Sequence, residues 1–230
     1  MRSRVAWRLA LALALLAPLA SCGVLRRLVG ATPLPPLEHY RLVFADSALA
    51  QTPLSADPAA PLLPGSLGIR PYSTPGLYGV DNIVFRIDET QYGSYPNREW
   101  AVPLSAMLGM MTERVLARRP LTRDGGVYDP PSRRTQAYIW RGAVRTFEEV
   151  DRGKQVFAEV RLEAALVRAS DDSVLWTGSA QASRQVADPA TMPRIVETLS
   201  ALAVEVIDRL VESARGSVRG IAAASTRETP

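Results

Sequence analysis

The residue with the most distinctive chemistry in this chain is Cys22, the only cysteine among 230 residues. It follows Leu19-Ala20-Ser21, which matches the lipobox that the bacterial lipoprotein signal peptidase cleaves. Arginines precede an apolar run over residues 9–17, and this run is too short to span a bilayer, which takes about 20 apolar residues. Residues 1–21 are therefore predicted to be a signal peptide that is cleaved between Ser21 and Cys22.

The thiol of Cys22 gives this position its chemistry. Its sulfur can take a diacylglycerol group, and cleavage then frees the Cys22 amine for a further acyl chain. Two or more acyl chains anchor a protein stably, whereas one chain holds it only marginally. The mature protein is thus expected to bind a lipid bilayer through acylated Cys22. The alternative is a plain cleaved signal that leaves a free thiol, and in either case a single cysteine forms no disulfide within the chain.

The charge of the expected mature chain is close to neutral. The formal net charge of the whole sequence is +4, and removing residues 1–21 takes away three arginines and leaves +1. Nucleic-acid binding draws on an excess of positive charge, and little net positive charge remains after cleavage. No nucleic-acid partner is expected.

Residues that could catalyse a reaction or bind a metal are sparse. His39 is the only histidine, and no G-x-S-x-G pattern marks a nucleophile. Asp171-Asp172 could bind a hard cation, but their position between two predicted strands favours a turn. Glu148 and Glu149 are adjacent in a predicted strand, so they should face opposite sides of the sheet. The sequence therefore predicts no enzyme, no metal site and no cofactor.

Proline content and apolar periodicity divide the chain into segments. Residues 22–37 are expected to form a lipidated, extended tether because they are rich in proline. Residues 38–213 are expected to form a single domain, interrupted by a proline- and alanine-rich loop over residues 45–65. Apolar periodicity weakens after Ala214, so residues 214–230 are predicted to be a disordered tail.

Within the domain, the period of the apolar residues alternates between that of strands and that of helices. A helix is predicted over residues 98–118 with Asn97 as its cap, and another begins after Thr191. Strands are predicted over residues 40–44, 66–72, 82–92, 137–150, 155–169 and 174–184. This β-β-β-α-β-β-β-α order predicts an α+β fold, a largely antiparallel sheet with two amphipathic helices on one face.

Four residues are candidates for a partner-binding surface. Tyr72, Pro75 and Tyr78 lie in a loop-like region between strands, where aromatic and proline residues suit a partner surface, although simple loop packing would explain them equally well. Trp140 lies on the less apolar side of its strand and is predicted to be exposed, so that ring assembly through the sheet would bury it.

The order of several short segments resembles the family of ABC-type transport auxiliary lipoproteins, which includes the paraquat-inducible protein C-like lipoproteins. The segments are Tyr40-x-Leu42, Ile69-Arg70-Pro71-Tyr72, Pro75, Ile83-Val84-Phe85-Arg86, Asn97-Arg98-Glu99-Trp100, Pro103-Leu104 and Val174-Leu175-Trp176-Thr177-Gly178. Together with the lipobox, they extend the resemblance over nearly the whole mature chain.

The resemblance implies a non-catalytic accessory subunit of a transport system with a permease, an ATPase and an MCE (mammalian cell entry) protein. Such a system moves lipids between two membranes, and its adaptor docks the periplasmic conduit to the outer membrane, in some members as a homo-oligomeric ring. No aspartate follows Cys22, since the next residues are Gly23 and Val24. By analogy, this favours the outer membrane, facing the periplasm.

Two other functions remain open from the sequence. The protein could bind lipid on its own, which would need an apolar cavity between the sheet and the helices, or it could regulate a cell-wall enzyme by contact. The apolar residues of the strand predicted over residues 155–169, and those of the helix that begins after Thr191, predict a packed core in place of such a cavity.

Overall fold

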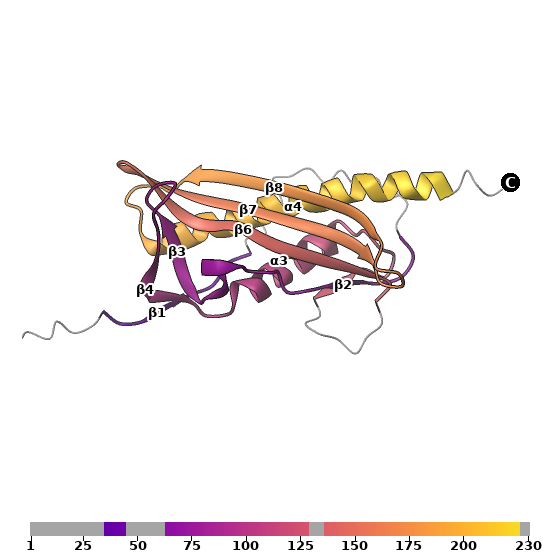
Figure 1. Ribbon diagram of the computed structural model, residues 1–230, viewed down its shortest axis with the longest axis horizontal. Coiled ribbons are helices and arrows are strands. Elements are labelled where there is room, and N and C mark those ends of the chain that lie inside the picture. Colours follow the sequence, from indigo (N-terminus) through magenta and orange to yellow (C-terminus); the bar gives the residue numbers. More distant parts are fainter. Residues whose placement is uncertain (1–34, 45–62, 129–135, 226–230) are drawn as a thin grey trace, which may run out of the picture. The chain divides into compact units, whose positions relative to one another are not determined.

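The computed structural model describes residues 35–44, 63–128 and 136–225. Ser21 and Cys22, the signal peptide and most of the tether lie outside the described residues. The described chain contains eight strands, one 3-10 helix and two α-helices (Figure 1). Before the first α-helix these are β1 (Glu38–Tyr40), β2 (Leu67–Ile69), η1 (Gly76–Gly79), β3 (Asn82–Arg86) and β4 (Tyr92–Trp100). The rest are α3 (Leu104–Arg118), β5 (Gly126–Tyr128), β6 (Tyr138–Arg152), β7 (Gln155–Arg168), β8 (Val174–Gln185) and α4 (Met192–Ser225).

The centre of the sheet is β6, which pairs on one side with β7 along its whole length. Strand β8 continues the antiparallel pairing beyond β7. The other edge of β6 is shared by β2 at its beginning, through Tyr138–Trp140, and by β3 near its end, through Glu149 and Val150. Both of these pairings are parallel and short. Strands β4 and β1 extend the sheet beyond β3, and β5 extends it beyond β2.

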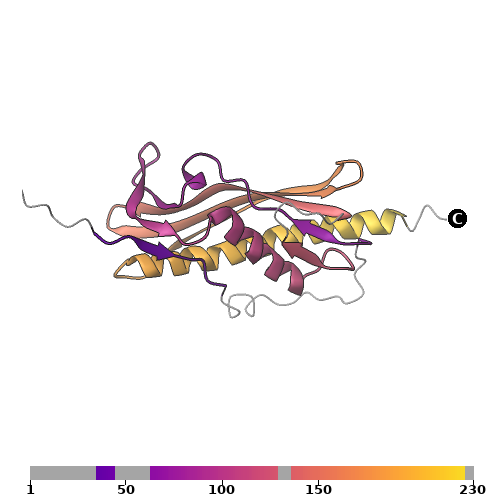
Figure 2. The same ribbon diagram turned by 90° about the horizontal axis from the view of Figure 1, so that it is seen from below.

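The two α-helices lie on one side of the long strands, as Figure 2 shows with α3 and α4 in front of the sheet. The inward residues of β7 are buried by this cover, and they alternate with charged residues on the opposite face; the buried ones are Ala158, Val160, Leu162, Ala164 and Leu166. This alternation follows from the two-residue period of a strand. The α+β class, with a mostly antiparallel sheet and two helices, is confirmed.

The structure corrects the strand count, since the described residues form eight strands where the sequence pattern gave six. Strand β4 occupies residues where the first helix was predicted to start, and Asn97 lies inside that strand instead of capping a helix. The helix begins at Leu104, directly after Pro103, whose carbonyl accepts hydrogen bonds from Ala106 and Met107. Pairing with both β1 and β3 holds these residues in an extended conformation. Strand β5 lies between the helix predicted over residues 98–118 and the strand predicted over residues 137–150, where no strand was predicted.

The last helix is longer than predicted. It continues through Ser225, so the disordered tail predicted from residue 214 is wrong for residues 214–225. The reason is that the buried apolar stripe of this helix continues beyond Ala214. Ala214 and Val218 are also buried, and they keep the four-residue spacing of one helix face with smaller side chains.

Candidate partner-binding surface

Two of the four predicted surface residues belong to the core. Tyr72 and Trp140 are buried, with 2% and 0% of their surface exposed. The Tyr72 hydroxyl lies 2.9 Å from the Thr112 hydroxyl on α3, and the indole N–H of Trp140 donates to the Tyr72 oxygen at 3.3 Å. The Trp140 ring also stacks on Trp176 of β8. The predicted exposure of Trp140 is therefore wrong, because its side of β6 faces the helices.

Space for the Tyr72 ring is provided by Gly142 on β6. A Cβ atom built on Gly142 would lie 2.3 Å from the Tyr72 ring, closer than real Cβ atoms approach a neighbour. The absence of a side chain at residue 142 thus allows an aromatic residue from a distant segment to pack against the strand. This side of β6 was predicted to be exposed because it is the less apolar one. In the structure, the missing side chain at Gly142 leaves a space that the Tyr72 ring fills.

The other two predicted residues lie at the surface, in the segment around η1. Pro75 is exposed and directly precedes η1, while Tyr78 lies within η1 and is partly buried. The neighbouring Leu77 and Val80 are 45% and 47% exposed. Residues 75–80, called the η1 surface below, therefore present apolar side chains outward around one anchored tyrosine.

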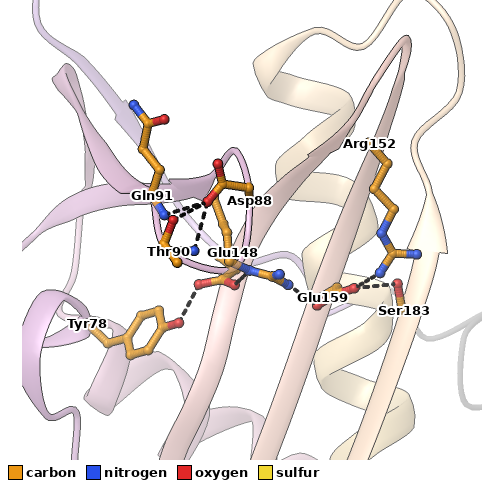
Figure 3. Close-up of polar contacts among 9 residues, drawn as sticks. Tyr78, Asp88, Thr90, Gln91, Glu148, Arg152, Glu159 and Ser183 are labelled. Atoms are coloured by element: carbon orange, nitrogen blue, oxygen red, sulfur yellow. Dashed lines mark hydrogen bonds and ion pairs between the residues drawn. The ribbon is translucent and has the colours of Figure 1, made fainter.

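Tyr78 is the anchor because it reaches a buried carboxylate of β6. Its hydroxyl donates a hydrogen bond to Glu148 Oε2 at 2.5 Å (Figure 3). Burial raises the pKa of Tyr78, and the hydrogen bond and negative charge of Glu148 raise it further. The phenol consequently keeps its proton and acts as a fixed donor that attaches η1 to the sheet.

Glu148 belongs to a chain of charges that crosses three strands (Figure 3). Glu148 on β6 and Glu159 on β7 are directly opposite in the antiparallel register, where two like charges repel. Arg86 of β3 contacts both, with its Nε 2.6 Å from Glu148 Oε1 and its Nη2 2.6 Å from Glu159 Oε2. Arg152 also pairs with Glu159, and the Ser183 hydroxyl of β8 donates to it at 3.3 Å.

Burial and the two carboxylates shift the pKa of Arg86 in opposite directions, and the carboxylates together outweigh burial. Burial alone would lower the pKa of Arg86, but the hydrogen bond to Glu148 and the charges of Glu148 and Glu159 raise it above its usual value. Arg86 is therefore a permanent cation between two acids. This arrangement links β3, β6, β7 and η1. Through Glu148 and Tyr78, it also fixes the position of the η1 surface on the sheet.

The adjacent Glu149 has different partners, as expected for neighbouring residues of one strand. Its carboxylate accepts a hydrogen bond from the Tyr95 hydroxyl of β4 at 2.8 Å. Burial raises the pKa of Glu149, although the hydrogen bond from Tyr95 and the charge of Arg98 oppose the rise. The Arg98 guanidinium lies 4.8 Å from the centre of the Tyr95 ring. The two glutamates thus support two separate contacts between strands.

The other residues with catalytic or metal-binding side chains are dispersed. His39 lies at the surface with its Nε2 3.9 Å from Glu99. Asp171 accepts hydrogen bonds from the amide and hydroxyl of Ser173 within the turn between β7 and β8. Within the described ranges, no three histidine, cysteine, aspartate or glutamate residues gather where they could hold a metal ion. Among the same residues, neither helix is long and apolar enough to cross a membrane.

Sequence reasoning missed the link from Tyr78 through Glu148 to Arg86. The three residues come from η1, β6 and β3, so no short motif joins them. The only signal in the sequence is an arginine and a glutamate placed within apolar strand patterns. The parallel pairing of β3 with β6 makes them neighbours.

Comparison with known proteins gives a family and a fold. A family model described as "ABC-type transport auxiliary lipoprotein component" matches residues 46–211. No curated protein matches the sequence. The crystal structure of protein XCC0632 from Xanthomonas campestris, of the DUF330 family, is 18% identical, with a TM-score of 0.62 over 81% of this chain and 99% of that chain. The crystal structure of an uncharacterized protein is 14% identical, with a TM-score of 0.53 and the same coverage. At these identities the likeness is one of fold.

Proposed function

Because this chain belongs to the family of ABC-type transport auxiliary lipoprotein components, we propose that it is a non-catalytic, periplasm-facing subunit of an MCE-type ABC transport system. It links the conduit of that system to the outer membrane, where acylated Cys22 anchors it, and it serves the transport of lipids between the two membranes. The family match over residues 46–211 is the observation that carries this proposal.

The η1 surface is the part of the described fold that best suits contact with an MCE-type protein or with the permease. Leu77 and Val80 are apolar and exposed, and Pro75 beside them adds little conformational freedom to lose on binding. The hydrogen bond from Tyr78 to Glu148 fixes the backbone of η1 against the sheet, and Arg86 in turn holds Glu148 in place. An apolar surface that is already held in place loses less entropy when a partner binds.

Photocrosslinking in cells tests this proposal. A photoreactive amino acid replaces Leu77 in the full-length lipoprotein, and a matched control places it at Val174, which is exposed at the start of β8. We expect adducts with an MCE-type protein or the permease from position 77 and none from position 174. Adducts with a cell-wall synthase alone would contradict the proposal and support a contact regulator. A normally expressed protein that gives no protein adduct at position 77 would also contradict it.

A further inference from the structure

A hollow of about 400 Å³ lies between the extended segment that follows β1 and the exposed side of α3. Its apolar lining includes Val43, Val102, Met107 and Met110, and two charged residues, Arg41 and Arg114, also line it. The peptide N–H of Leu42 points at the Met107 sulfur, at 3.3 Å, which fixes the segment against the helix. This hollow, called the α3 groove below, is separate from the η1 surface.

Three apolar residues of the α3 groove are exposed to solvent, while Met107 and Met111 form its buried floor. Val43, Val102 and Met110 have 53%, 38% and 39% of their surface accessible. Single exposed apolar residues are ordinary, whereas several that line one hollow indicate a binding site. Methionine side chains are flexible and polarisable, so they can adapt to a flexible apolar ligand. The lining therefore favours a hydrocarbon ligand.

The charges that line the α3 groove have one sign. Arg41 and Arg114 are cationic, and the other lining residues are uncharged. The Arg114 guanidinium lies 5.2 Å from the centre of the Phe44 ring, so it is held beside the apolar lining. A guanidinium group binds phosphate oxygens well because its N–H groups match their geometry. The complementary ligand has an anionic, oxygen-rich group at one end of an apolar chain.

From these observations we infer that the α3 groove binds an anionic phospholipid, with one acyl chain in the hollow and the phosphate against Arg41 and Arg114. The volume suits a small ligand, since it lies near the lower end of the 300–1,000 Å³ that is usual for such pockets. An α-helix is roughly 10 Å across with its side chains, so a hollow of about 400 Å³ would hold only a few of its residues. A single acyl chain is thus favoured over an amphipathic peptide helix.

The position of the α3 groove in the chain agrees with this ligand. Arg41 follows the expected attachment residue, Cys22, by a segment that spans at most roughly 70 Å when fully extended. A protein anchored at Cys22 therefore keeps the groove within reach of a bilayer. The inference requires a lipid, but it does not require the transport partner proposed above.

The test uses the full-length lipoprotein in cells with a photoreactive amino acid at Val102. Two controls carry it at Leu37 and at Val174, which are both exposed and do not line the groove. After irradiation, mass spectrometry identifies the adducts. We expect phospholipid adducts mainly at position 102. The double substitution Arg41→Glu and Arg114→Glu should reduce them about tenfold or more, because each charge-assisted contact contributes substantially to affinity. The charge-reversal control Lys154→Glu, in the turn after β6, should leave them unchanged.

Three results would overturn the inference. Equal lipid adducts at positions 37 and 102 would indicate mere contact with the bilayer surface. Adducts with a protein, or with residues 45–62 of this chain, would identify a different occupant of the groove. Adducts that persist in the arginine double variant would exclude phosphate recognition by Arg41 and Arg114. Failure of this inference can be told apart from failure of the proposed function. The proposed function is tested by protein adducts at position 77, whereas this inference is tested by lipid adducts at position 102.

Discussion

Glu148 shows at the scale of single residues how this fold keeps a charge inside the sheet. Its side chain is 2% exposed, and a buried carboxylate is costly unless it is paired and hydrogen-bonded. Arg86 of β3 supplies the opposite charge, and Tyr78 of η1 donates a hydrogen bond. Other ion pairs of the sheet, such as Arg145 with Glu163, are much more exposed and should contribute little.

Replacing Arg86 with methionine should therefore lower the free energy of unfolding by about 3–5 kcal/mol, because Glu148 would remain buried without its cation. Urea denaturation measures the loss. The matched control is Arg145→Met, where the pair with Glu163 is half-exposed and the expected loss is at most about 1 kcal/mol. Equal losses in the two variants would show that the buried network has no special role.

At the scale of elements, α4 is the feature whose length depends on tertiary packing. Its C-terminal part contains Gly216 and Gly220, which weaken a helix. Ala214, Arg215 and Val218 are nevertheless buried in this part. Packing of one face therefore extends the helix where the intrinsic propensity is low.

Gly216→Ala tests this extension. A Cβ atom at residue 216 meets nothing within 4 Å, so the substitution should add up to about 1 kcal/mol of stability through helix propensity alone. Thermal or urea unfolding measures the gain. The control is Gly153→Ala in the β6–β7 turn, where φ is +67°, and alanine there should cost about 1 kcal/mol. No change at residue 216 would mean that the helix ends before it.

At the scale of the whole molecule, an ion pair joins the two helices. The Arg119 side chain, just after α3, is 5% exposed, and its Nε lies 2.8 Å from Asp208 Oδ1 on α4. Its Nη1 lies 2.8 Å from Glu212. Burial raises the pKa of Asp208, while the charge of Arg119 opposes the rise. Where α3 meets α4, the Arg119 cation thus compensates a buried acid.

Arg119→Met should destabilise the molecule by about 3–5 kcal/mol, because it leaves the Asp208 charge buried. The double variant with Asp208→Asn should recover part of this loss, and the single change Glu212→Gln, at a more exposed partner, should cost far less. Far-UV circular dichroism and tryptophan fluorescence should report coincident transitions, since both follow one core. A double variant as unstable as Arg119→Met would contradict the buried-charge explanation.

Local patterns in the sequence predicted much of this architecture. The alternation of β7 and the apolar stripe of α4 predicted the α+β class. Strands and helices repeat every two and about 3.6 residues, so residues a few positions apart reveal them. The lipobox around Cys22 is equally local, and acylation there stays a prediction. Pro75 and Tyr78 were predicted as surface candidates from residue type and position, and they lie together in the η1 surface.

Other features were decided by tertiary structure alone. Trp140 was assigned to the wrong face because the ring that fills the space over Gly142 comes from Tyr72, far away in the sequence. The parallel pairing of β3 with β6 brings Arg86 to Glu148 across some sixty residues, and it is short. A pairing of two residues leaves no periodic trace in the sequence. Its stability comes from contacts that exist only once the chain has folded.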